Sequence, residues 1–158
     1  MMNTKIYKSV YSLAEQLMEA ANKDDRETFD SLYAELKVIC VDNENTDKDH
    51  PVQWETLADF TEELEDSVAG YATALEKSIA INSKDYMSSI AFSMATLQIE
   101  LGQTDAAIKN LQDAKTSANK IEDKELKAEI DELLETLLKG EAQWKAYSGW
   151  ETAYLHNI

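Results

Sequence analysis

Four carboxylates with metal-binding potential, Asp42, Glu44, Asp47 and Asp49, lie in the segment 42–50, which reads DNENTDKDH. Alternating carboxylates are typical of a calcium-binding EF-hand loop, which also needs a glycine at its sixth position and a glutamate at its twelfth. Counted from Asp42, the sixth residue is Asp47 and the twelfth is Gln53. The spacing therefore predicts a solvated acidic loop and no metal site.

Histidine and cysteine, the other common ligands and nucleophiles, are rare in this chain. His50 and His156 each lack a second histidine or a cysteine at ligand spacing, so we expect no zinc site. His50 precedes Pro51, which suits the first turn of a helix, and we expect His50 to help that helix begin. Cys40 stands at the end of an apolar helical face in acidic surroundings, which predicts a buried, inert thiol.

A second acidic group resembles the paired carboxylates of a general acid and base. Its members are expected on the polar side of a helix, whereas a catalytic acid needs a desolvated pocket that raises its pKa. We therefore expect a solvent-exposed acidic patch. Glycine-rich phosphate loops are absent from the sequence, and we predict no catalytic residue, no cofactor and no enzymatic activity. The acidic patch comprises Glu62, Glu63, Glu65 and Asp66.

The charge of the chain limits its partners. The 158 residues carry a net charge of −16, and the segment 24–66 holds fifteen acidic residues against three basic ones. No basic stripe of the kind that binds nucleic acid is visible. No segment approaches the roughly 18 apolar residues of a membrane span, and residues 1–11 lack a signal-peptide core. With one cysteine, the chain is expected to be cytoplasmic, and its acidic half is suited to steering a basic protein.

Apolar residues recur at helical spacing along most of the chain, and glycine and proline are few. Leu57, Leu64 and Tyr71 are spaced by seven, which predicts one continuous helix over 52–81, with Gly70 as a position where it could break or kink. Short breaks between helices favour antiparallel hairpins. The expected helices are 5–21, a segment after Asp24, 52–81, 84–101, 105–119 and 123–139. Their expected boundary residues are Asp24 with Glu27 as a capping box, Asn82 and Ser83 as caps, Thr104 as a cap, and Gly102 and Gly140 as ends.

The C-terminal segment carries aromatic residues at helical spacing. In a stack of helices, a terminal helix must cover the exposed apolar end, so a capping role is the first interpretation. The alternative is an association surface, because tryptophan and tyrosine dominate binding hot spots. The aromatic residues are Trp144, Tyr147, Trp150 and Tyr154.

The stretch Ser88 to Lys120 resembles a tetratricopeptide repeat, a pair of helices with small residues where the backbones approach. With Gly102 as the turn glycine, the small positions are Ala95, Ala107 and Ala114, and Leu111 takes the large apolar position. Residues 71–82 are similar to the second helix of a preceding repeat. The sequence departs from the family at Ala91, Gln98 and Asn119, where the family often has Trp, Tyr and Pro.

The resemblance implies an all-α fold in which antiparallel helix hairpins stack as a short right-handed solenoid of about six to seven helices. It also implies one domain over 1–158, with an N-terminal hairpin (1–41), a repeat-like core (52–119) and a C-terminal helix with a capping tail (120–158). The first helix of each repeat would line a groove that binds a protein or peptide. In the best repeat the groove positions would be Ser89, Phe92, Thr96 and Ile99.

These groove positions offer no basic clamp, so the resemblance implies a basic or amphipathic partner. The expected function is therefore that of a non-catalytic binding scaffold or adaptor. One alternative is a self-associating structural protein that forms a homodimer through the aromatic tail. The other is a small acidic inhibitor that occupies a basic site on its partner.

Overall fold

A computed structural model describes the backbone of residues 3–156 and the side chains of residues 3–140. Over this range the chain forms seven α-helices and no strand, which confirms the predicted all-α class. Caps and short turns separate the helices, and the longest helix is the last one. The helices are α1 (Thr4–Asn22), α2 (Arg26–Asn43), α3 (Pro51–Asp59), α4 (Leu64–Ala80), α5 (Lys84–Glu100), α6 (Thr104–Ala118) and α7 (Lys124–His156).

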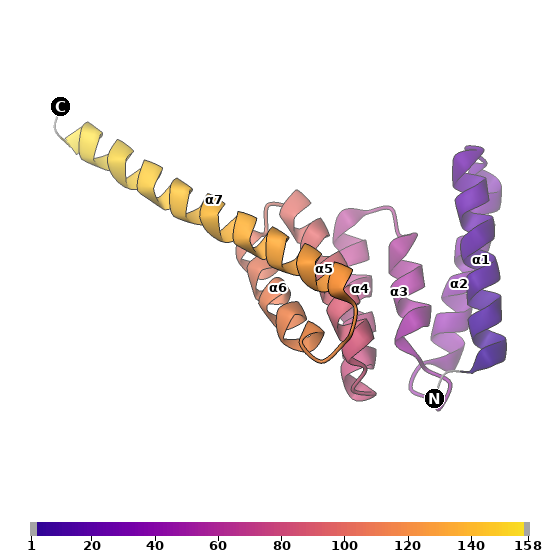
Figure 1. The fold of residues 1–158 in the computed structure, drawn as a ribbon. Helices are drawn as coiled ribbons and strands as arrows, with labels where there is room; N and C mark the ends of the chain where they lie inside the picture. Colours follow the sequence, from indigo (N-terminus) through magenta and orange to yellow (C-terminus); the bar gives the residue numbers. More distant parts are fainter. Residues whose placement is uncertain (1–2, 157–158) are drawn as a thin grey trace.

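The helices are arranged in chain order, with α1 and α2 at one end of the molecule and α6 and α7 at the other (Figure 1). Each helix packs against its neighbours in the chain. In addition, α3 contacts both α1 and α5, so these three helices contribute to one face of the described structure. None of the described helices combines the length and apolar character that crossing a membrane requires.

The start of α2 differs by one residue from the sequence-based expectation. Asp25, not Asp24, is the N-cap, and its side chain accepts a hydrogen bond from the amide of Thr28 at 3.2 Å. Asp24 has a φ of 55°, which lies in the left-handed region. This conformation differs from the extended one that is usual at an N-cap. The predicted capping box of Asp24 with Glu27 is therefore wrong, although an aspartate does cap this helix.

The expected continuous helix over 52–81 is also wrong, because the chain folds back at residues 60–63 to form α3 and α4. At the break, backbone amides and side-chain hydroxyls together satisfy the last carbonyl groups of α3. The Thr61 hydroxyl donates to the carbonyl of Leu57 at 2.7 Å, and the Ser67 hydroxyl donates to that of Ala58 at 2.8 Å. Leu57 and Tyr71 are both buried, but they pack in different core groups, Leu57 with α1 and α2 and Tyr71 with α3, α4 and α5.

Two further helix boundaries differ from expectation. Thr104 is the first residue of α6 rather than its cap, and the N-cap Gln103 makes no side-chain capping bond. Gly140 does not end a helix, because α7 continues through it to His156. By contrast, Ser83 caps α5 and Gly102 adopts a φ of 75°, both as predicted. A glycine ends a helix only where it takes up the left-handed conformation, and among the described glycines Gly102 alone does so.

The two mid-helix glycines are in different surroundings, which gives a matched pair of substitutions. A Cβ at Gly140 would meet nothing within 4 Å, whereas one at Gly70 would lie 3.0 Å from the Cβ of Ala58. Gly140→Ala is expected to raise the free energy of unfolding by about 0.5 to 1 kcal/mol through helix propensity. Gly70→Ala should gain nothing, because α3 and α4 must separate to admit the methyl group. Chemical denaturation of both variants checks this, and an equal gain in both would contradict the close contact at Gly70.

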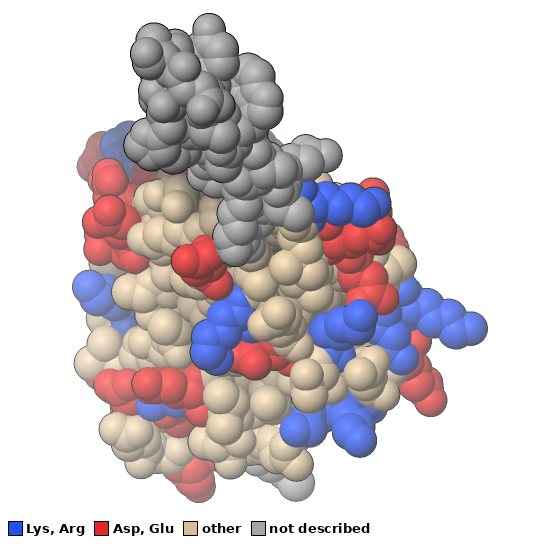
Figure 2. Space-filling view, turned by 90° about the vertical axis from the view of Figure 1, so that its left-hand side faces the viewer, with Lys and Arg blue, Asp and Glu red and all other residues tan. Residues whose placement is uncertain are grey.

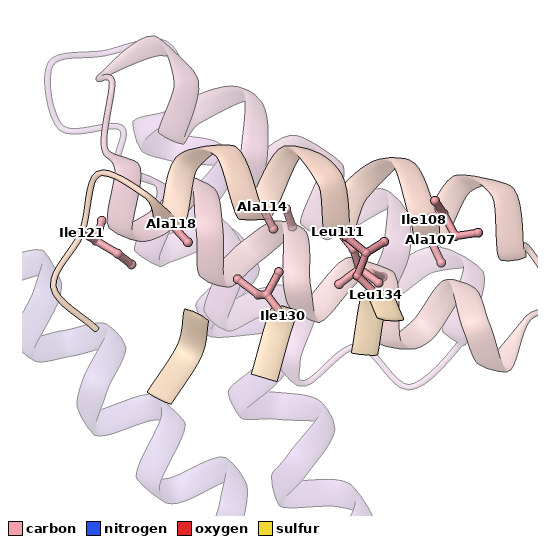
Figure 3. Packing of buried hydrophobic residues seen from close by; sticks show 10 residues of the cluster. Ala107, Ile108, Leu111, Ala114, Ala118, Ile121, Ile130 and Leu134 are labelled. Carbon is pink, nitrogen blue, oxygen red and sulfur yellow. The ribbon is translucent and has the colours of Figure 1, made fainter. Parts of the chain in front are cut away.

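The core consists of three groups of buried side chains along the row of helices. One joins α1, α2 and Leu57, a second joins α3, α4 and α5, and the third joins α5, α6 and α7. Figure 3 shows the third group, in which Leu111 lies beside Leu134 of α7, and Ile130 of α7 lies beneath Ala114. The four positions of the repeat resemblance are at most 1% exposed, as close helix packing requires: Ala95, Ala107, Leu111 and Ala114.

Candidate functional site

The face formed by α1, α3 and α5 carries an unusual set of aromatic and acidic side chains. On α1, the exposed rings of Tyr7 and Tyr11 stack with their centroids 6.5 Å apart. On α5, Tyr86 is half-buried, and both Tyr7 and Glu55 lie close enough to act on its ionisation. We call the set Tyr7, Tyr11, Glu55, Asp59, Tyr86 and Ser89 the α1–α3–α5 face.

Two carboxylates of α3, one helical turn apart, accept hydrogen bonds from neutral hydroxyl groups. The Ser89 hydroxyl of α5 donates to Oε2 of Glu55 at 3.3 Å, and the Tyr71 hydroxyl of α4 donates to Oδ1 of Asp59. Glu55 is half-buried, while Asp59 lies at the surface. Within the described part of the chain, no lysine or arginine forms an ion pair with either carboxylate.

The surroundings change the ionisation of these groups. Burial, together with the negative charge of Asp59, raises the pKa of Glu55 to about 7, although the hydrogen bond from Ser89 opposes this. Burial also raises the pKa of the Tyr71 phenol, and the hydrogen bond to Asp59 adds to the effect. Tyr71 is therefore a permanent donor at neutral pH, whereas Glu55 exchanges its proton with solvent near neutrality.

In the segment 44–50 two carboxylates are paired with a lysine, unlike Glu55 and Asp59. The Lys77 ammonium of α4 lies 2.9 Å from Oδ2 of Asp49 and 3.4 Å from Oε2 of Glu44. Burial alone would raise the pKa of Asp49, but the amide of Asn45, the indole of Trp54 and Lys77 together hold it below its ordinary value. Asp49 and Glu44, two of the four carboxylates in the EF-hand comparison, are thus paired with a cation of the chain itself.

The predicted groove residues of α5 divide into two groups. Ser89 lies on the α1–α3–α5 face, bonded to Glu55. Phe92 and Ile99 are half-buried and pack against the core group shared with α6 and α7, and the Thr96 hydroxyl donates to the carbonyl of Ser93. The partly buried side chains of α7 that pack on the same core are Leu126, Leu133 and Leu137.

The acidic patch surrounds the turn between α3 and α4. Glu62 and Glu63 lie in the turn, Glu65 and Asp66 lie in the first turn of α4, and all four are exposed. Carboxylates in the first turn of a helix stabilise it, because their negative charge interacts favourably with the positive end of the helix dipole. The Arg26 guanidinium bonds both carboxylate oxygens of Glu62 and lies 5.1 Å from the ring of Phe29. The hydrogen bonds from Arg26 hold the pKa of Glu62 below its ordinary value.

Two further sequence-based expectations concern single residues. Cys40 is fully buried, as predicted, and its thiol donates to the carbonyl of Gln53 at 3.3 Å. Burial and the charges of Asp49 and Glu44 raise the pKa of this thiol to about 12, so it stays protonated. His50 caps α3, with Nδ1 accepting from the amide of Val52 at 3.1 Å, which confirms its expected role.

The aromatic tail lies outside the residues whose side chains the structure describes. This applies to Trp144, Tyr147, Trp150 and Tyr154.

Figure 2 views the end of the molecule where α6 and α7 lie, and there lysine and arginine are interspersed with aspartate and glutamate. This end therefore differs from the predominantly acidic segment 24–66.

Sequence reasoning missed Glu55, Asp59 and Tyr86. The spacing of four between Glu55 and Asp59 placed them on one side of a helix. No sequence signal linked them to Ser89 of α5 or Tyr71 of α4, because those contacts follow from the unexpected break at 60–63.

No protein-family model, curated protein or solved structure matches this chain. Its function must accordingly be argued from the chemistry of the side chains described above.

Proposed function

We propose that this protein is a non-catalytic binding module of the tetratricopeptide-like type, built from stacked helix hairpins. Two observations support this architecture. The small residues of the repeat-like stretch are buried between α5 and α6, and α3 contacts both α1 and α5. The first helices of successive hairpins would then line one face, as in repeat proteins that bind extended partners.

The proposed partner is a basic, amphipathic segment of another protein, bound on the α1–α3–α5 face. The observation that carries this proposal is the pair of carboxylates Glu55 and Asp59, for which the described residues provide no cation. A lysine or arginine side chain would supply the missing charge. The rings of Tyr7, Tyr11 and Tyr86 would contact the same side chain and its apolar neighbours, since aromatic faces attract cations.

A carboxyl group with a pKa near 7 also suits acid–base catalysis, but the shape of the surface favours binding. A shallow hollow of about 220 Å³ lies between α5 and the start of α7, lined by Tyr86, Leu126 and Ser89, the hydrogen-bond partner of Glu55, among others. Small-molecule sites are usually enclosed and about 300 Å³ or larger. The α1–α3–α5 face is open, and its carboxylates and tyrosine rings are spread over three helices. Such a surface suits contact with the side chains of a partner protein better than enclosure of a small-molecule substrate.

Selection from a library of random twelve-residue peptides tests the proposal without assuming a ligand. We expect the enriched peptides to carry lysine or arginine beside aromatic or aliphatic residues. Their affinity, measured by fluorescence anisotropy, should fall about ten-fold in the double variant Glu55→Gln with Asp59→Asn, in line with the loss of an ion pair in a partly desolvated site.

A variant with the same charge change at the acidic patch, Glu63→Gln with Glu65→Gln, serves as the matched control and should bind normally. Loss of binding in this control alone would favour the acidic-inhibitor alternative and contradict the proposed face. Enrichment of uncharged or acidic peptides would contradict the proposed partner.

A further inference from the structure

The contact between α3 and α5 contains a hydroxyl group with two alternative acceptors. Oγ of Ser89 lies 3.3 Å from Oε2 of Glu55 and 3.5 Å from the carbonyl oxygen of Tyr86, which belongs to the same helix as Ser89. When Glu55 is ionised, the hydroxyl must donate to it. When Glu55 carries a proton on Oε2, the carboxyl can donate to Oγ while the hydroxyl turns to the carbonyl of Tyr86. The same atoms therefore accommodate both protonation states.

The groups facing Glu55 are neutral or acidic on every neighbouring helix. Asp59 lies one turn away on α3, Tyr71 lies on α4, and Tyr86 lies on α5, where Asp85 in turn acts on Tyr86. Tyr7 of α1 approaches the same cluster through Tyr86. Two ionised carboxylates at this spacing repel each other, and burial strengthens the repulsion. The geometry thus favours a proton on one of the pair, and Glu55 is the more buried of the two.

We infer that the Glu55–Ser89 contact is a proton-sensitive joint between α3 and α5. In mildly acidic solution the protonated carboxyl holds the two helices together without adding charge. In mildly alkaline solution Glu55 ionises, and its half-buried charge favours separation of α3 from α5, because separation returns the carboxylate to water. The joint belongs to the ligand-free protein, so the inference goes beyond the proposed binding function and does not depend on it.

The sign of the pH dependence follows from the direction of the shift. The pKa of Glu55 is about 7 in the folded protein, against 4.5 for the ordinary carboxyl. Between these values the folded state binds the extra proton, so this group's stabilisation is complete below about pH 4.5 and is lost as the pH rises through about 7. His50 acts in the opposite sense, because burial lowers its pKa and its contribution is lost as the pH falls below 6.5.

A carboxyl ¹³C NMR titration of the ligand-free protein measures the joint directly. The Glu55 signal, assigned from its absence in Glu55→Gln, should titrate with a midpoint near 7. In Asp59→Asn the midpoint should fall by about one pH unit, because the neighbouring charge is gone while Tyr71 keeps its acceptor. A Glu55 midpoint near the ordinary value of 4.5, or one that Asp59→Asn leaves unchanged, would overturn the inference.

Amide hydrogen exchange then tests whether the proton controls the helix contact. Protection factors in α3 and α5 should fall about ten-fold between pH 5.5 and pH 8 in the wild-type protein. In Glu55→Gln, whose amide mimics the protonated carboxyl, this fall should disappear. Any pH dependence that comes from His50 is the same in both proteins, so it cancels when wild type and variant are compared at each pH. The exposed variant Glu63→Gln should behave like wild type. A pH dependence that persists unchanged in Glu55→Gln would refute the joint.

Discussion

Replacing Leu111 with alanine is expected to lower the free energy of unfolding by about 3 to 4 kcal/mol. Leu111 of α6 is 0% exposed and lies at the centre of the core group that joins α5, α6 and α7 (Figure 3). Truncation removes the burial of its side chain and leaves a cavity that the helices fill only in part. Chemical denaturation followed by circular dichroism measures the effect.

The matched control is Leu138→Ala in α7, where the side chain is 44% exposed and little apolar contact is lost. This substitution should change stability by less than about 1 kcal/mol. Equal effects of the two substitutions would contradict the packing of α6 against α5 and α7. A selective loss at Leu111 would support the close helix packing on which the repeat-like architecture depends.

Replacing Lys77 with glutamine is expected to cost about 2 to 3 kcal/mol. The Asp49 side chain is only 8% exposed, and without the Lys77 ammonium at 2.9 Å its charge is left largely uncompensated. The amide of Asn45 and the indole of Trp54 still donate to Asp49, which keeps the loss below that of a fully isolated buried charge. Thermal denaturation at neutral pH measures the loss, with increased hydrogen exchange expected in residues 44–50.

The pH dependence of this variant provides a second test. In the wild-type protein the pKa of Asp49 lies below its ordinary value of 3.8, so its contribution is present above that value and is lost as the pH falls through the lower folded value. In Lys77→Gln the loss should begin at a higher pH. Lys109→Gln, which breaks an exposed pair with Asp113, is the control and should change stability by less than about 0.5 kcal/mol. A similarly small effect at Lys77 would show that the segment is held by its hydrogen bonds alone.

Most of the helices could be predicted from the sequence because their boundaries depend on local chemistry. Ser83 and Gly102 mark α5 through a hydroxyl cap and a left-handed conformation, which are properties of single residues. The break between α3 and α4 was missed because residues 60–63 contain neither glycine nor proline. There the Ser67 hydroxyl of α4 donates to the carbonyl of Ala58 near the end of α3, a tertiary contact that a local sequence pattern does not reveal.

The candidate site was only partly predictable for the same reason. Ser89 was identified from its place in the repeat-like stretch, and the structure brings it to Glu55. Glu55 itself belongs to a helix whose direction was mistaken, so its approach to α5 could not be inferred. An exposed acidic patch is visible in a sequence as a run of charges, whereas a half-buried carboxylate is recognised only when its neighbours are known.

The most direct test of the proposed binding face is an NMR titration of the ¹⁵N-labelled protein with the tightest-binding basic peptide from the library selection. We expect the largest amide shift changes on α1, α3 and α5, around Tyr7, Glu55 and Tyr86, and we expect them to shrink in the Glu55→Gln, Asp59→Asn variant. Shift changes confined to the acidic patch at residues 62–66, or spread evenly over the surface, would contradict the proposed binding face.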